Sequence, residues 1–194
     1  MKVYDITQEL LSAEIYPGDP SPKITTLASM KSGALYNLYS LDTCLHVGTH
    51  IDAPRHFIRD GKTVEELEAD IFVGRAYVAE PALLSRIEAA EILAAAKSLS
   101  AAERILIKGD AVVTLEAAEL FAAGGVRLIG VESQSVGSID APAAVHIALL
   151  SRGVALLEGL RLKEISTGAY TLVAPPLKVA GAEGAPCRAL LIEE

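Results

Sequence analysis

The sequence predicts a mixed α and β fold in a single domain that covers residues 1–194. Three observations predict it. Short apolar β-like segments alternate with Ala-rich segments of helical periodicity, further β-like segments lie at both ends, and no linker, repeat or low-complexity tract divides the chain. A plain doubly wound sheet is not expected, because no glycine-rich phosphate loop follows the first strand. With 194 residues, 51% of them hydrophobic, the chain can close a substantial core.

The N-terminal part is expected to contain strands and turns. Residues 3–6 alternate apolar and polar side chains, as a short strand does. Residues 16–20, Tyr-Pro-Gly-Asp-Pro, form a dense turn signal. Residues 36–45 alternate loosely and are expected to form another strand.

The central part should alternate strands with helices. Strands are expected at residues 76–79, 104–108 and 126–131, and helices at residues 87–96 and 115–123. The second helix should end at Gly124 and Gly125, because glycine is favoured just after a helix C-terminus.

The C-terminal part begins with a third helix. Asp140 is expected to cap it, with its first turn at Ala141 and Pro142 and its end at Gly153. Strands are then expected at residues 154–157, 170–174 and 188–192.

The charge of the chain argues against several classes of function. The 17 basic and 25 acidic residues give a net charge of -8, which repels phosphate backbones and anionic lipids, so neither nucleic acid nor membrane is an expected partner. No apolar run approaches the roughly 20 residues that span a bilayer. Asp5 stands where a signal peptide would be apolar, and Cys44 and Cys187 are too few for a disulfide framework. We therefore expect a cytoplasmic protein.

Three of the four histidines lie close together with an aspartate. The cluster consists of His46, His50, Asp52 and His56, at offsets of 0, 4, 6 and 10. All four offsets are even, so on an extended chain these side chains share one face. A fully extended chain would separate the first and last by roughly 33 Å, so the segment must bend, and Gly48 and Pro54 permit it. Imidazoles beside a carboxylate predict a site for Zn²⁺ or a similar metal.

The fourth histidine, His146, lies in the third expected helix, and Glu158 follows the next strand. The helix would rise about 9 Å from His146 to its end, and the following strand would return about 13 Å to Glu158. These lengths are consistent with the two side chains meeting at one end of a helix–strand hairpin. Each residue also has an ordinary interpretation, since a histidine in an apolar helix often packs in the core and a glutamate after a strand is often solvated.

The string His46-x-Gly-Thr-His50-x-Asp52-x-Pro-x-His56 resembles the signature of the bacterial kynurenine formamidase (arylformamidase) and cyclase family of metal-dependent hydrolases. Further segments resemble that family. They are the turn at residues 16–19, the Ser-containing loop at residues 133–136, the stretch at residues 145–160 and the C-terminal strands at residues 174–177 and 184–188. The resemblance covers nearly the whole chain.

The resemblance implies a swivelling β/β/α cyclase-like fold and a site for two metal ions per subunit. His46 and His50 would bind one ion and His146 the second, and the carboxylates of Asp52 and Glu158 would bridge the two ions. His56 would be the catalytic acid/base. The ligand set suits Zn²⁺ and, as an alternative, Mn²⁺. Family members are commonly homodimers or homotetramers.

The implied reaction is hydrolysis of a carbon–nitrogen (amide) bond in a small molecule. Metal ions lower the pKa of bound water toward ~7, and His56 would deliver a proton to the leaving nitrogen. The best-defined substrate is N-formylkynurenine, which yields kynurenine plus formate in tryptophan catabolism. Tyr16 would contact the substrate, but it stands where the family is expected to have Trp, and Glu132 replaces an expected Asp.

These departures keep two other functions open. The first is hydrolysis of a different cyclic or non-aromatic amide by the same site, and the second is a metal-binding protein without catalysis. Arg55 could pair with a substrate carboxylate or be solvated, and Cys44 is expected to be a structural thiol.

Overall fold

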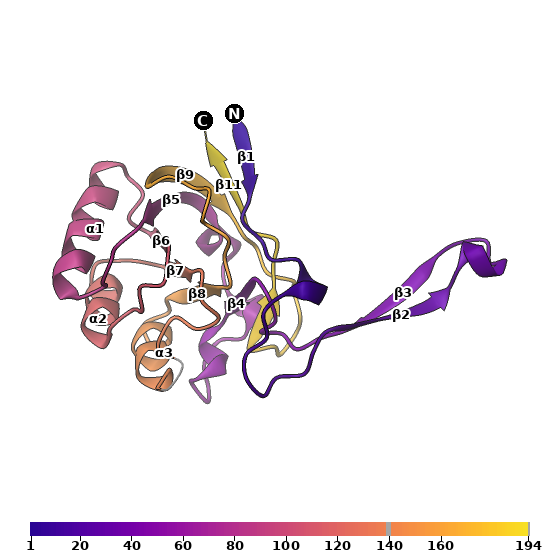
Figure 1. Cartoon of the computed structure of the whole chain (residues 1–194). Coiled ribbons are helices and arrows are strands. Elements are labelled where there is room, and N and C mark those ends of the chain that lie inside the picture. Colours follow the sequence, from indigo (N-terminus) through magenta and orange to yellow (C-terminus); the bar gives the residue numbers. More distant parts are fainter. Residues whose placement is uncertain (139–140, 194) are drawn as a thin grey trace.

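A curled sheet of nine strands forms the body of the protein in the computed structural model, which describes residues 1–138 and 141–193 (Figure 1). In sheet order the strands are β1 (Lys2–Asp5), β11 (Leu190–Glu193), β9 (Gly168–Val173), β5 (Val73–Ala79), β6 (Arg104–Ile107), β7 (Leu128–Val131), β8 (Ala155–Glu158), β4 (His50–Asp52) and β10 (Gly184–Pro186). The four central strands, β5 to β8, are parallel, and the strands on either side of them are antiparallel. The predicted mixed α and β class is therefore confirmed.

Three helices connect the parallel strands and cover one face of the sheet (Figure 1). They are α1 (Arg86–Ser98), α2 (Leu115–Ala123) and α3 (Ala143–Leu150). Ser85 and Glu88 form a capping box at the start of α1, and Thr114 caps α2. After α2 the chain turns at Gly124 and Gly125 as predicted. The predicted start of α3 is two residues early, because Pro142 is its N-cap, and the predicted cap Asp140 lies outside the described residues.

Short 3-10 helices lie in the loops, at Leu10–Ser12, Met30–Ser32, Pro54–His56, Val64–Glu66 and Ala69–Ile71. Among the described helices none is both long and apolar enough to cross a membrane.

The central strands are buried on both sides, which explains their continuous apolar sequences. In β6, Ile105 packs in the cluster beneath the helices, whereas the next residue, Leu106, packs in the cluster on the opposite face. Successive side chains of a strand point to opposite faces, so each strand contributes to both cores. Full burial of one such side chain contributes about 1.5–3 kcal/mol. The carboxyl end of β8 is thereby held rigidly next to β4.

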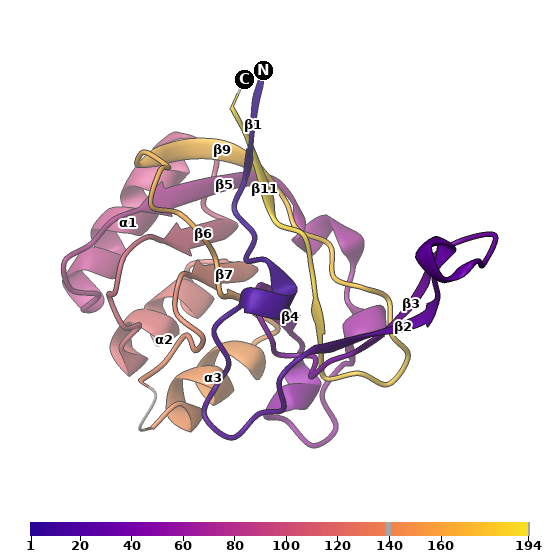
Figure 2. The same ribbon diagram turned by 45° about the vertical axis from the view of Figure 1, so that its right-hand side comes forward.

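A second, two-stranded sheet projects from the body in both views (Figures 1 and 2). It consists of β2 (Lys23–Ala28) and β3 (Leu38–Asp42), and we call residues 23–42 the arm. The strand expected at residues 36–45 is thus shorter than predicted, because the chain bends into the site after Asp42. No sequence pattern predicts β2, whose side chains are not buried, whereas β10 falls within the C-terminal strand at residues 184–188 that the family resemblance implies.

Candidate metal centre and active site

The bend predicted in the histidine cluster lies at Gly48, which adopts a left-handed φ of +67°. His46 lies in the turn before this bend, and His50 and Asp52 lie on β4. The Thr49 hydroxyl holds the turn in place, since it accepts a hydrogen bond from the backbone N–H of Gln8 (2.8 Å) and donates one to the carbonyl of Gly159 (2.6 Å). The chain can therefore bring His46 back over Asp52, as an extended segment could not.

Strand register brings the two distant parts of the site together. β4 pairs with β8 so that His50 lies opposite Glu158. His146 lies on α3, the helix that precedes β8, and its Nε2 atom is 3.3 Å from Glu158 Oε1. The predicted meeting of helix and strand at one end of the hairpin is confirmed.

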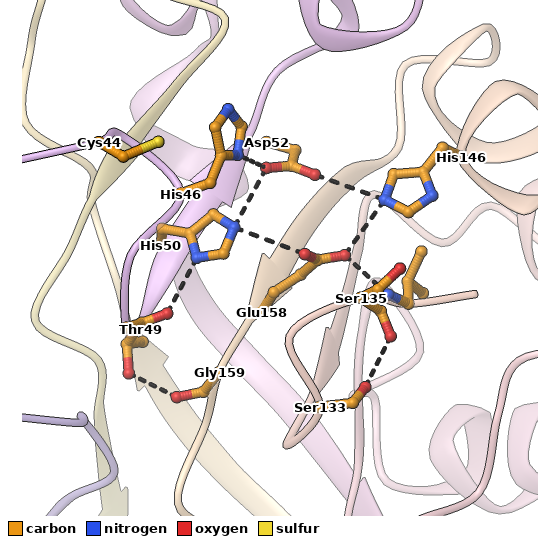
Figure 3. A network of polar contacts seen from close by, with 12 residues as sticks. Cys44, His46, Thr49, His50, Asp52, Ser133, Ser135, His146, Glu158 and Gly159 are labelled. Atoms are coloured by element: carbon orange, nitrogen blue, oxygen red, sulfur yellow. Dashed lines mark hydrogen bonds and ion pairs between the residues drawn. The ribbon is translucent and has the colours of Figure 1, made fainter. Parts of the chain in front are cut away.

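Asp52 lies at the centre of the cluster (Figure 3). His46 Nδ1 donates to Asp52 Oδ1 at 2.8 Å, and His50 Nε2 is 3.4 Å from the same oxygen. His146 Nε2 is 3.6 Å from the other oxygen, Oδ2. His50 Nε2 is also 3.4 Å from Glu158 Oε2. Two groups of potential metal ligands result. The first consists of His46, His50 and Asp52, and the second of Asp52, His146 and Glu158. Within each group the atoms that could bind a metal ion lie within 4.8 Å of one another.

Backbone carbonyls orient two of the imidazoles. His50 Nδ1–H donates to the carbonyl of Gly48, and His146 Nδ1–H donates to that of Pro142, both at 2.9 Å. Each ring therefore presents Nε2 to the carboxylates, an arrangement typical of metal-binding histidines. The Val136 backbone N–H donates to Glu158 Oε1 at 2.7 Å and orients that carboxylate in turn.

These residues fit divalent metal ions. His50, Asp52 and Glu158 are at most 3% exposed, yet His50 Nε2 and Asp52 Oδ2 have no hydrogen-bond partner among the described residues. Buried polar atoms without partners are costly. Ligands about 2.0–2.1 Å from a tetrahedral Zn²⁺ lie about 3.3 Å from one another, close to the separations of 3.3–3.6 Å between these side chains. A metal ion would therefore satisfy both unpaired atoms.

The short distances between these side chains shift the pKa values of Asp52 and His50. Burial raises the pKa of Asp52, but the hydrogen bond with His46 and the nearby imidazole of His50 outweigh burial and hold it well below its usual range. Burial lowers the pKa of His50, but the nearby carboxylates of Asp52 and Glu158 raise it to about 10. The two buried carboxylates thus strongly favour positive charge beside them, whether from protons or from metal ions.

His56 lies beside the cluster but in neither ligand group. It ends the 3-10 helix Pro54–His56, and its ring stacks on that of His46 with centroids 4.2 Å apart. Burial, followed by the positive charge of His46 and His146, outweighs the nearby carboxylates and lowers the pKa of His56. A neutral imidazole here can accept a proton near neutral pH.

The cluster opens into a pocket of about 410 Å³. Its walls include Tyr16, His56 and Glu158, together with residues that the sequence analysis did not single out for the site: Asp19, Phe57, Gln134, Ser135, Pro142 and Glu183. Asp19, Gln134 and Ser135 lie in the segments at residues 16–19 and 133–136 that resemble the family, and Phe57 directly follows His56. Glu183, whose Oε1 is 3.4 Å from His46 Nε2, is brought to the site by the pairing of β10 with β4.

Three other residues noted in the sequence have clear positions. Arg55 is exposed and does not line the pocket, which favours the solvated interpretation. Cys44 lines the pocket, with its Sγ 3.8 Å from Asp19 Oδ2. Glu132 accepts hydrogen bonds from the backbone N–H groups of Gly109 and Leu162, both at 2.7 Å, so it joins two loops outside this pocket.

The fold and the site together define a metal-dependent hydrolase. Residues 4–138 match the family model described as "Cyclase: Putative cyclase". The kynurenine formamidase of Salinibacter ruber is 35% identical over 98% of this chain and 97% of its own length, and that of Sphingopyxis alaskensis is 33% identical over 99% and 98%. The chain therefore belongs to the cyclase family, as the sequence motifs indicate.

Solved structures agree with this assignment. One described as a "potential metal-dependent hydrolase with cyclase activity" has a TM-score of 0.79 and 30% identity, covering 98% of this chain and 96% of its own. Isatin hydrolase A from Labrenzia aggregata has a TM-score of 0.79 at 23% identity, covering 100% of this chain and 94% of its own, and shares the fold. The predicted cyclase-like fold is confirmed.

Proposed function

We propose that this hydrolase cleaves an amide bond with two divalent metal ions per subunit. The ligands would be His46, His50 and Asp52 for one ion and Asp52, His146 and Glu158 for the other, and Zn²⁺ and Mn²⁺ both suit this donor set. The observation that carries the proposal is the position of Asp52, which belongs to both ligand groups, while the other members of these groups line the pocket. A buried carboxylate shared by two such groups suits a bridging role.

The metal ions would supply a polarised carbonyl and a water of lowered pKa. The side chains of the protein would supply the proton transfers. His56 lies half-buried beside the cluster and has a lowered pKa, so it can take a proton from the attacking water and deliver it to the departing amine. An amine leaves poorly as an anion, so this second transfer is essential to amide cleavage.

The best candidate substrate is N-formylkynurenine, which would yield kynurenine plus formate. The relatives from Salinibacter ruber and Sphingopyxis alaskensis are named kynurenine formamidase. A pocket of about 410 Å³ suits a ligand of this size. Tyr16 and Phe57 provide two aromatic rings in its wall, one of which can contact the aryl group of the substrate.

A different amide, cyclic or non-aromatic, is the second candidate. Tyr16 favours it, because this tyrosine stands where the formamidases are expected to carry Trp, and the chain contains no Trp at all. The same metal centre and the same proton transfers would serve this reaction. We further propose a cytoplasmic homodimer or homotetramer in which residues 1–194 act as one domain.

A turnover assay on N-formyl-L-kynurenine tests the proposal. Zn²⁺ and Mn²⁺ are supplied separately, and His56→Ala serves as the inactive control. Formation of kynurenine by the wild type alone would establish the formamidase. Absence of turnover in a sample that contains metal would contradict this substrate and favour another amide, and a panel of lactams and linear amides without turnover would leave a metal-binding protein without catalysis.

A further inference from the structure

The mouth of the active-site pocket carries negative charge. Two carboxylates, those of Asp19 and Glu183, lie in its wall on loops, and both are partly exposed. No lysine or arginine is among the described residues that line the pocket. Arg55, the arginine considered above for a substrate carboxylate, is exposed and lies outside it. A negatively charged group of a ligand would therefore meet two carboxylates in this wall and no cationic side chain of the described chain.

The two carboxylates lie against the same short segment of chain. Asp19 is held in the turn that begins at Tyr16, because its backbone N–H donates to the Tyr16 carbonyl at 3.0 Å. The Cys44 thiol donates to Asp19 Oδ2 at 3.8 Å, and Glu183 Oε1 is 3.4 Å from His46 Nε2. Cys44 and His46 are only two residues apart and lie side by side in Figure 3. One ligand group at the mouth can therefore approach both carboxylates.

No cationic side chain neutralises these two carboxylates. In residues 1–138 and 141–193, neither Asp19 nor Glu183 forms an ion pair with a lysine or an arginine. The thiol beside Asp19 is a weak donor. Carboxylates that face a pocket without such a partner attract a positively charged group of a ligand and repel a negatively charged one.

Unpartnered polar side chains point independently to a polar ligand in this pocket. Ser135 lines it and is only 8% exposed, yet its Oγ has no hydrogen-bond partner among the described residues. The buried Nε2 of Gln134, in the same wall, also has no partner among them. Buried donors of this kind are costly unless a ligand satisfies them, and both can donate to a neutral carbonyl oxygen. The pocket therefore suits a ligand that has both a carbonyl group and a positive charge.

We propose that Asp19 and Glu183 bind an ammonium group of the substrate. This inference rests on the proposed function, which takes the pocket to hold an amide. The amide must lie beside His56 and the metal ligands, so the rest of the substrate extends toward the two carboxylates at the mouth. The preferred substrate class is thus an amide that carries an amino group and no carboxylate. In N-formylkynurenine, which carries both, the amino group would be bound and the carboxylate would face solvent.

Four aryl formamides of nearly the same shape separate the two charges. They are N-formylkynurenine, its analogue without the carboxylate, its analogue without the ammonium group, and the analogue with neither. The ratio kcat/KM is measured for each at low ionic strength, where surface charges are least screened. We expect the ammonium-only analogue to exceed the uncharged one about tenfold, which is the effect of two partly exposed ion pairs. The carboxylate-only analogue should be the poorest of the four.

Variants that keep the shape of the side chains assign the preference to these residues. Asp19→Asn and Glu183→Gln should each lower the preference for the ammonium-only analogue about threefold, and the double variant should abolish it. Glu91→Gln removes the same charge from an exposed position on α1, outside the pocket, and is the matched control. It should keep the wild-type preference. A preference that survives the double variant, or that is lost in the control, would overturn the proposal.

Binding of the deformylated products tests the subsite without turnover. These aryl amines are not hydrolysed, so calorimetry with the wild type gives their Kd values directly. Turnover without a preference for the ammonium group would overturn the subsite and leave the hydrolase intact. No turnover of any formamide, with product binding that depends on the ammonium group, would contradict the formamidase and support the subsite. No turnover, with product binding that is absent or independent of this group, would overturn both.

Discussion

The floor and the rim of the pocket are built in different ways. The floor is formed by His50, His146 and Glu158, with Asp52 buried among them. These four residues are at most 3% exposed and are held by strand register and by backbone hydrogen bonds. The rim, formed by Tyr16, Asp19 and Glu183, lies on loops and is partly exposed, with 41% of the Glu183 side chain accessible. Rigid buried elements suit the fixed geometry of catalysis, whereas loops can change with the substrate. We therefore expect variants of the floor to abolish chemistry and variants of the rim to alter the choice of substrate.

The largest effect is expected for Asp52→Ala. This change removes the carboxylate common to both ligand groups, so both metal ions and measurable activity should be lost. Metal analysis of the dialysed protein, together with the turnover assay, provides the measurement. Two tightly bound ions in the variant would rule out a bridging role for Asp52.

His56→Ala should separate proton transfer from metal binding. His56 belongs to neither ligand group, so metal content should stay near that of the wild type. Loss of a general acid/base should lower kcat by about 10²–10⁴-fold. A variant that loses metal together with activity would show instead that His56 is a ligand.

The sequence predicts the floor far better than the rim. His46, His50, Asp52 and His56 fall within eleven residues, so their chemistry is visible without a fold. Meeting of His146 with Glu158 could be anticipated from the lengths of one helix and one strand. Glu183 could not, because only the pairing of β10 with β4 brings it close, and the sequence does not show which strand β10 pairs with.

The same distinction applies to the fold. The central strands and helices were predicted because their burial produces continuous apolar runs and helical periodicity, with capping residues such as Ser85 and Thr114 at the helix starts. The arm was predicted only in part. Its apolar residues do not pack in a core of this chain, so their pattern carries no information about the core.

Gly48→Ala should show how far the floor depends on one turn. An alanine at φ +67° costs about 1–2 kcal/mol of folding stability, and its Cβ would lie 3.2 Å from that of Ala13. The Gly48 carbonyl orients His50, so metal affinity should fall as well. Urea unfolding and metal titration measure the two effects.

Gly153→Ala is the matched control for that turn. Gly153 has a similar φ of +76° but no atom within 4 Å of an added Cβ, and it lies at the end of α3 away from the floor. It should lose comparable stability and keep the metal affinity of the wild type. Equal metal affinities in the two alanine variants would show that the turn at Gly48 does not position the site.

The smallest effect is expected at the rim, from Tyr16→Trp. Tyr16 lies in the turn at the root of the arm and lines the pocket without belonging to a ligand group. A larger ring could add about 0.5–1.5 kcal/mol of contact with an aryl substrate, which corresponds to a KM for N-formylkynurenine about 2–10-fold lower. Because the floor is unchanged, kcat and metal content should stay near the wild-type values. Tyr16→Phe, which keeps the smaller ring, is the control and should show no such gain. A fall of kcat in the Trp variant on aryl and non-aryl amides alike would mean that the turn at Tyr16 helps to shape the floor, and that the separation between floor and rim is wrong at this residue.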